Sequence, residues 1–297
     1  MSALPVPGVG VGHAATGGSG VTVVVLPPGT IGSGEVRGGA PASRELDLLE
    51  PTRTVAHLDA IVFAGGSAFG LAAADGVVVA LAAEGRGVDT SGGPVPIVPA
   101  ACIFDLSGSA AAPPGPAEAV AALAAARVGG PVATGRVGAG TGATVGKWRG
   151  REYAVPGGLG VASATVDGAT VSALAVVNAI GDVVGADGRV LAGSTAPESV
   201  PPFPAPAPFA ERGDTTLVAI VTDAALDKPG CFLLAQSAHD GLARAIFPVH
   251  TRFDGDLVIA AATGTATASI DRLRVAVTEV TATAVRSAVG PARPEPE

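Results

Sequence analysis

Short apolar runs alternate along the first half of the chain with longer, alanine-rich segments. The runs at 20–26 and 58–65 are rich in β-branched residues and end at proline or glycine, which predicts strands. Helices are predicted over 67–85, opened by Ser67, and over 115–130, closed by a pair of glycines. This alternation is typical of a layered α/β protein.

The second half has shorter strands, then a Pro/Ala-rich tether, then the alternation of strand and helix again. The shorter strands are predicted within PVATGRVGAGTGATVG, LGVASATV and TVSALAVVNAIGDVV. The tether, residues 192–212, is the segment that looks unstructured. After it the pattern predicts two strands, at 215–223 and 256–263, and two helices, at 230–246 and 267–287. Because this last part is too small to ensure a core of its own, residues 1–297 are expected to form a single domain.

Composition narrows the functional classes. Hydrophobic residues make up 48% of the chain, mostly alanine and valine, which predicts an interior of small, closely packed side chains. The net charge of −8, without a Lys/Arg cluster, argues against nucleic acid or membrane surfaces as partners. With no signal-peptide pattern and no long apolar span, a soluble cytoplasmic protein is expected. Cys102 and Cys231 stand in apolar surroundings and are predicted to be buried free thiols.

Two glycine-rich stretches resemble known motifs and fail their requirements. In GAGTGATVGK the lysine is followed by Trp148, where a phosphate-binding loop needs Ser or Thr. In GGSAFG, position 69 is Phe, where a nucleophile elbow needs glycine. These glycines are interpreted as tight turns. The histidines lack metal-ligand spacing, and structural roles are expected for them: His13, His57, His239 and His250. No metal and no organic cofactor is expected.

Asp254 and Asp256 flank Gly255 in the stretch FDGD. On a strand this spacing points both carboxylates to the same face. Two interpretations stay open. The pair caps a turn before a strand, or it orients a neighbouring nucleophile or amine and pairs with a cation, for which Lys147 is a candidate.

The most informative position is the junction between the tether and the strand that follows it, at Asp214 and Thr215. If the bond between them is cut, Thr215 becomes a new N-terminus whose amine has a pKa of about 7.7–8.0, suited to a general base at neutral pH. Nucleophile and base then belong to one residue, as in catalysis by an N-terminal threonine. A flexible tether would make the bond accessible and let the new C-terminus move away.

The sequence resembles the L-aminopeptidase D-Ala-esterase/amidase family, the DmpA-like peptidases, which include β-aminopeptidases and nylon-oligomer hydrolases. Eight blocks carry the resemblance, in the family's order and over nearly the whole chain: VGHAATGGSGVTVVVL, RGGAPASRELDLLEP, GGSAFGLAAADGV, VPIVPAACIFDL, GAGTGATVGK, VVNAIGDV, DTTLVAIVTDAALDK and AHDGLARAIFPVHTRFDGD.

The resemblance implies an αββα sandwich of the kind that DmpA and ornithine acetyltransferase share. It implies self-cleavage into a large segment, 1–214, and a small segment, 215–297, and assembly as a homotetramer. The expected activity is hydrolysis of small peptides or amides through an acyl-enzyme on Thr215.

The remaining site residues also follow from the resemblance. The family asparagine matches Asn178, which would donate to the developing oxyanion. The lysine of the nylon-hydrolase branch matches Lys147, and its acidic pair matches Asp254 and Asp256. Together these three would hold the hydroxyl and amine of the nucleophile in position.

Two positions depart from the family pattern. Asp214 stands where many relatives have Asn or Gly, which implies slower or pH-dependent self-processing. Phe104 stands where aminopeptidase relatives have a tyrosine, so no tyrosine role carries over and the branch near the nylon-oligomer hydrolases fits better. Two alternatives remain open: an acyltransferase of the ornithine acetyltransferase type, and a non-catalytic oligomeric descendant.

Overall fold

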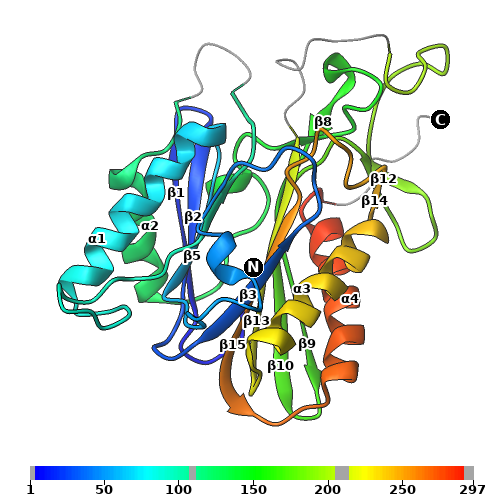
Figure 1. Cartoon of the computed structure of the whole chain (residues 1–297). Coiled ribbons are helices and arrows are strands. Elements are labelled where there is room, and N and C mark those ends of the chain that lie inside the picture. The colour runs from blue at the N-terminus through cyan, green and yellow to red at the C-terminus, as the bar shows by residue number, and fades with distance from the viewer. Residues whose placement is uncertain (1–3, 107–111, 205–213, 291–297) are drawn as a thin grey trace.

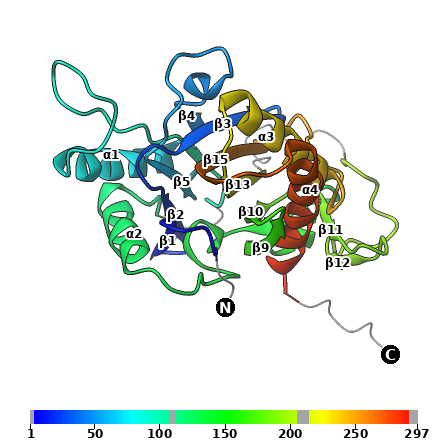
Figure 2. The ribbon, with the colours of Figure 1, turned by 90° about the horizontal axis from the view of Figure 1, so that it is seen from below.

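Two five-stranded sheets lie face to face at the centre of the molecule, and a pair of helices covers the outer face of each (Figure 1, Figure 2). The computed structural model describes residues 4–106, 112–204 and 214–290. Within these ranges the layers run helix, sheet, sheet, helix, which confirms the predicted αββα sandwich.

The first sheet comes from the N-terminal part of the chain and is covered by α1 and α2. Its strands, in spatial order, are β1 (Gly10–Thr16), β2 (Ser19–Val25), β5 (Ala60–Ala64), β6 (Ala100–Cys102) and β4 (Ser43–Arg44). The helices are α1 (Ala73–Ala83) and α2 (Pro116–Val128). Pairing is antiparallel except between β5 and β6.

The second sheet brings together strands from distant parts of the sequence and is covered by α3 and α4. Its strands, in spatial order, are β3 (Ile31–Val36), β15 (Leu257–Ala266), β13 (Thr215–Ala224), β10 (Ala169–Asn178) and β9 (Gly158–Val166). The helices are α3 (Lys228–Ala243) and α4 (Ile270–Ser287). Only β13 and β15 are parallel within this sheet.

Short strands and 3₁₀ turns lie outside the two five-stranded sheets. The strands are β7 (Thr144–Val145), β8 (Val155–Pro156), β11 (Asp182–Val184), β12 (Val190–Ala192) and β14 (Ile246–Phe247). The 3₁₀ turns are η1 (Asp47–Leu49), η2 (Ser67–Ala72), η3 (Gly138–Gly140) and η4 (Arg151–Tyr153).

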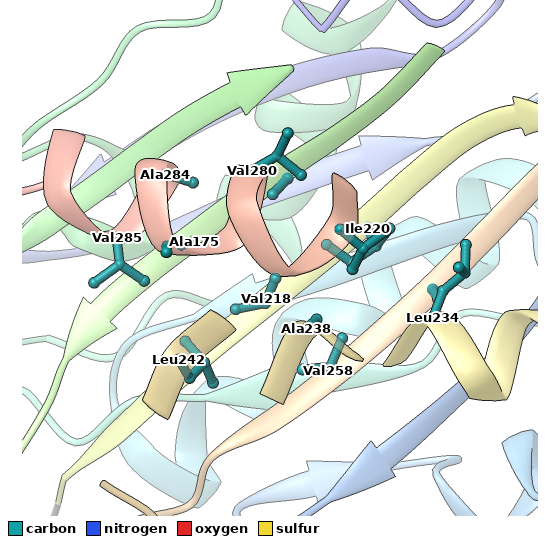
Figure 3. Packing of buried hydrophobic residues seen from close by; sticks show 14 of the residues in the cluster. Ala175, Val218, Ile220, Leu234, Ala238, Leu242, Val258, Val280, Ala284 and Val285 are labelled. Carbon is teal, nitrogen blue, oxygen red and sulfur yellow. The ribbon is translucent and has the colours of Figure 1, made fainter. Parts of the chain in front are cut away.

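Strand β13 lies inside the second sheet, and all ten of its residues are buried. Because side chains alternate along a strand, Val218 and Ile220 pack under α3 and α4, while Leu217 and Ala219 face the other sheet. Figure 3 shows the helix side of this packing, where Leu242 of α3 and other side chains of both helices cover the sheet. A strand buried on both faces reads as a continuous apolar run, which is why its sequence predicts it well.

The predicted packing of small side chains is confirmed where helices approach the sheets. A Cβ atom added to Gly12 on β1 would lie 2.0 Å from the carbonyl oxygen of Ala122 on α2. One added to Gly160 on β9 would lie 2.0 Å from the carbonyl oxygen of Ala284 on α4. Helix backbones therefore rest directly on glycines of the sheets.

Several predicted boundaries need correction. The helix expected over 67–85 starts as a 3₁₀ turn, and its α-helical part begins only at Ala73. Ser67 is not its N-cap, because Ser67 itself has a positive φ of 54° and its N–H donates to Ile103 O. Within 131–146 the only strand is β7, and most of that segment is loop around η3. The remaining predicted strands and helices are confirmed to within a few residues.

The first part of the tether has no helix or strand beyond Ala192, but hydrogen bonds fasten it. Thr195 N–H donates to Tyr153 O at 2.9 Å, and Phe203 N–H donates to Trp148 O at 2.8 Å. The remainder of the tether, residues 205–212, lies outside the described residues.

Two further expectations can be compared with the structure. Cys102 and Cys231 are free and buried, as predicted, and burial raises the pKa of Cys231 to about 12. No helix in the described ranges is long and apolar enough to cross a membrane.

Candidate active site

The bond between Asp214 and Thr215 lies at the start of β13, where the tether enters the second sheet. Thr215 pairs with Asn178, the last residue of β10, in the antiparallel register of the two strands. All three residues are buried, at 2%, 3% and 0% exposure for Asp214, Thr215 and Asn178. The junction that stands out in the sequence is therefore a polar site inside the sandwich.

The carbonyl oxygen of Asp214 accepts two hydrogen bonds. One comes from the neighbouring hydroxyl, Thr215 Oγ1, and the other from the backbone N–H of Gly255 at 2.8 Å. A Cβ atom at position 255 would come within 2.7 Å of Thr215 Oγ1, so glycine leaves room for the hydroxyl. The sequence analysis did not anticipate the Gly255 N–H, because a backbone donor leaves no trace in side-chain motifs.

The side chains of Lys147 and Asn178 lie beside this bond and contact each other. Lys147 Nζ lies 2.6 Å from Asp214 Oδ1 and donates to both the backbone oxygen and Oδ1 of Asn178, each at 3.0 Å. Asn178 Oδ1 also accepts from Thr144 N–H at 3.0 Å, and Asn178 Nδ2 donates to Phe104 O at 3.1 Å. The asparagine thus fixes the lysine, and it connects the lysine to the segment that carries Phe104.

Burial lowers the pKa of the Lys147 ammonium, and the Asp214 carboxylate is the strongest influence that opposes this shift. The charge of Arg151 lowers the same pKa, whereas that of Asp254 raises it. The protonation of Lys147 therefore depends on a residue whose peptide bond is the predicted cleavage site.

Arg151 is a second cation at the site, and the sequence analysis missed it. It begins η4, and its guanidinium Nη2 lies 3.7 Å from Asp214 Oδ1. The guanidinium carbon also lies 5.3 Å from the centre of the Phe104 ring, a cation–π contact. A single arginine on a polar loop matches no motif, so only the fold reveals this position.

Asp254, the first member of the acidic pair, is held within the turn that precedes β15. Its Oδ2 accepts from Thr251 N–H at 3.0 Å and from Thr251 Oγ1 at 2.6 Å, and its Oδ1 accepts from Ile180 N–H at 3.3 Å. Burial, together with the nearby charges of Asp256 and Asp214, raises the pKa of Asp254 to about 8. These contacts match the turn-capping interpretation, and the residue also stands beside the site.

Asp256, the second member, contacts the strand that carries the candidate nucleophile. Its Oδ1 accepts from the backbone N–H of Thr216 at 2.6 Å. Its Oδ2 accepts from His250 N–H at 3.1 Å and lies 2.8 Å from His250 Nδ1. Asp256 therefore positions the residue next to Thr215. The ion pair of Lys147 is with Asp214, a partner that the sequence analysis did not name.

Two of the four histidines lie next to Asp256: His250 contacts its carboxylate, and His239 contacts His250. The rings of His250 and His239 meet edge to face, with centroids 4.8 Å apart, and His239 Nε2 lies 3.1 Å from Glu35 O. Burial lowers the pKa of His239 to about 3, so this ring stays neutral. The structural roles expected for these two residues agree with the contacts, although the proximity of His250 to the site was not foreseen.

The sequence profile of peptidase family S58 matches residues 4–295, so the chain belongs to this family and is a hydrolase. An uncharacterised aminopeptidase of Mycobacterium leprae is 47% identical over 272 residues, which cover 85% of this chain and 73% of the relative. A 6-aminohexanoate-oligomer endohydrolase of Paenarthrobacter ureafaciens is 34% identical over 273 residues, with coverage of 86% and 73%.

Solved structures agree with this family. A β-aminopeptidase of Burkholderia sp. superposes with a TM-score of 0.72 at 26% identity, over 95% of this chain and 84% of that one. The L-aminopeptidase D-Ala-esterase/amidase of Ochrobactrum anthropi, described as a variant of the Ntn-hydrolase fold, superposes with a TM-score of 0.70 over the same shares. At 20% identity the second likeness shows the fold. The resemblance drawn from the sequence is confirmed.

Proposed function

We propose that this chain cleaves itself between Asp214 and Thr215, and that Thr215 then serves as the N-terminal nucleophile of an amidohydrolase for small peptides or amides. The observation that supports this proposal is the contact of Thr215 Oγ1 with the carbonyl oxygen of Asp214, on which the N–H of Gly255 also converges. An N–H donor at that oxygen stabilises the negative charge that develops when the carbonyl carbon is attacked.

Self-cleavage proceeds as an acyl shift from nitrogen to oxygen. Thr215 Oγ attacks the carbonyl carbon of Asp214, the C–N bond breaks, and the nitrogen takes up the hydroxyl proton. The acyl group of Asp214 is then joined to Thr215 by an ester. Water hydrolyses the ester, which leaves a carboxylate at the end of the 1–214 fragment and a free amine and hydroxyl on Thr215.

In later turnovers the Thr215 amine accepts the hydroxyl proton as Oγ attacks the substrate, and returns it to the departing amine. Lys147 stays fixed by Asn178 and assists these proton transfers. Once Asp214 has left, Lys147 loses the strongest influence that keeps its pKa up, so its neutral form becomes more accessible. The Gly255 N–H, and the Asn178 amide as expected from the family, stabilise the oxyanion.

Water is the proposed acceptor of the acyl group. An amine acceptor would make the protein an acyltransferase, the alternative left open by the sequence. The relatives are named as aminopeptidases and an oligomer endohydrolase, and both names describe hydrolysis of an amide bond. We therefore place short peptides and linear amides as the substrate class.

The test is to purify the protein and follow its maturation on a denaturing gel. We expect two fragments, 1–214 and 215–297, and N-terminal sequencing of the smaller one should read Thr-Thr-Leu-Val. The matured protein should release p-nitroaniline from aminoacyl p-nitroanilides without an added amine acceptor. A fragment that begins at any other residue would refute Thr215 as the nucleophile.

A further inference from the structure

Asp214 is the first acyl group that Thr215 would attack, and its side chain therefore marks a subsite. This step depends on the function proposed above, in which one hydroxyl performs both self-cleavage and turnover. Any later substrate must place its carbonyl carbon where that of Asp214 lies. Its acyl-side side chain then occupies the space that the Asp214 side chain fills in the intact chain.

That space is lined by two cations. Lys147 Nζ lies 2.6 Å and Arg151 Nη2 lies 3.7 Å from the same atom, Asp214 Oδ1. The Lys147 side chain is 1% exposed and the Arg151 side chain 29%, so the subsite has a buried inner end and a partly open outer edge. The Phe104 ring supports the arginine from one side.

The two carboxylates of the acidic pair have hydrogen-bond donors of their own. The two carboxylates use their oxygens on other donors: the N–H of Ile180 and the N–H and hydroxyl of Thr251 for Asp254, and the N–H of Thr216 with His250 for Asp256. When the fragment that ends at Asp214 departs, the lysine and arginine lose the carboxylate that they share. At the buried end of the subsite, where Lys147 lies, replacing that carboxylate is strongly favourable.

We infer that the matured enzyme prefers substrates whose acyl-side residue carries a carboxylate at the length of aspartate, such as peptides and amides with an N-terminal aspartyl group. Arg151 is the residue that sets this preference. Lys147 is held by Asn178 and takes part with every substrate, whereas Arg151 stands at the partly open edge of the subsite, where its guanidinium contacts the acyl-side carboxylate.

The experiment compares p-nitroanilides of L-aspartate, L-asparagine and L-alanine on the fully matured enzyme. Asparagine has the shape of aspartate without its charge, and the ratio of the two kcat/KM values within one preparation cancels any difference in active fraction. We expect kcat/KM for the aspartyl substrate to exceed that for the asparaginyl substrate by about tenfold or more. Arg151→Gln should lower this ratio at least about threefold.

Arg149→Gln is the matched control, because Arg149 lies on the same loop and its guanidinium contacts the Trp148 ring, at 5.0 Å from the ring centre. This variant should keep the wild-type ratio. A wild-type ratio at or below one, with alanyl or asparaginyl substrate still hydrolysed, overturns the inference and leaves the proposed function standing. Absence of hydrolysis of all three substrates by matured enzyme overturns both. A high wild-type ratio that Arg151→Gln leaves unchanged removes the assignment of Arg151.

Discussion

The chain has two lysines, and both are buried to 6% exposure, yet their surroundings differ in kind. Lys228 lies in the first turn of α3, on the side of the N-terminal loops. Its Nζ donates to three backbone carbonyls, those of Leu48 at 2.7 Å, Arg53 at 3.1 Å and Val55 at 2.7 Å. The lysine thereby ties one loop to a helix from the far end of the sequence.

Lys147, by contrast, has a carboxylate among its partners, and that carboxylate belongs to the acyl side of the predicted cleavage site. Backbone carbonyls are permanent, so the environment of Lys228 does not change during the life of the protein. Under the proposed function, the partner of Lys147 would leave once the bond between Asp214 and Thr215 is cut. Burial of a lysine therefore does not by itself indicate a catalytic role. The group that accepts its hydrogen bonds distinguishes a structural lysine from a candidate catalytic one.

The largest effect is expected at the start of β13, where Thr215 would act as the nucleophile, and it can be compared with a substitution at the other end of the same strand. Thr215→Ala removes the hydroxyl that attacks, so the chain should stay full length and folded, with no detectable turnover. Thr222→Ala, at the other end of β13, removes a hydrogen bond to Thr170 O and should cost about 1–2 kcal/mol while maturation continues. A denaturing gel and an aminoacyl p-nitroanilide assay measure both. Turnover by Thr215→Ala would end the proposed mechanism.

The two lysines can be compared directly by substitution with methionine. Lys147→Met leaves the buried Asp214 carboxylate without the nearer of its two cations and should destabilise the precursor by about 3–5 kcal/mol. Adding Asp214→Asn should recover most of that stability but no turnover. Lys228→Met leaves three carbonyls without their donor and should lower the free energy of unfolding by about 3 kcal/mol or more. The fraction of this variant that folds should keep its specific activity.

Urea denaturation of the unprocessed chain, in a Thr215→Ala background, gives the stabilities for both lysines. Activity per matured molecule is measured separately in the Thr215 background. Equal loss of specific activity in Lys228→Met and Lys147→Met would remove the distinction between the two regions.

A smaller effect is expected from Asp256→Asn. The carboxylate holds the N–H of Thr216 and so positions the adjacent Thr215, and its loss should lower kcat about 10²-fold with little change in melting temperature. The assay needs already matured protein, because slow maturation would imitate slow catalysis. Asp59→Asn, at a buried carboxylate bonded to Ile97 N–H and Arg86, is a control far along the chain from these residues that should change stability alone. Wild-type turnover by Asp256→Asn would leave the carboxylate with a turn-capping role.

The last prediction is a pH dependence of stability that comes from Asp254, a residue whose charge acts on Lys147. Because the pKa of Asp254 is raised to about 8 in the fold, from about 3.9 in an unfolded chain, the protonated carboxyl favours folding. That contribution is complete below pH 3.9 and is lost as the pH rises through about 8. In the Thr215→Ala background, Asp254→Asn should therefore flatten the fall in unfolding free energy between pH 5 and pH 8. Parallel curves with and without the substitution would show that Asp254 is ionised throughout.

Much of the fold could be predicted from local pattern, because the elements that matter most are strongly patterned. The run after Thr215 is apolar on both faces and predicts a central strand, and α2 and α4 follow from alanine-rich and amphipathic periodicity. Strands β1 and β3 were missed because glycines interrupt their alternation, and those glycines are there to admit helix backbones and neighbouring side chains. A glycine that is needed for a tertiary contact thus weakens the sequence pattern by which the strand could be predicted.

The candidate site also has one part that the sequence predicts and another that only the tertiary structure reveals. By itself the sequence predicted the bond between Asp214 and Thr215 as the cleavage site, since a change of composition and a hydroxyl residue at a strand start are properties of adjacent positions. Only the tertiary structure decided that Lys147 pairs with Asp214, that the Gly255 N–H meets the carbonyl, and that Arg151 joins them. These contacts arise because β10, β13 and β15 pair side by side and bring loops from distant positions to one end of the sheet. Strand pairing is a long-range choice set by the packing of the whole core, so no single segment carries it.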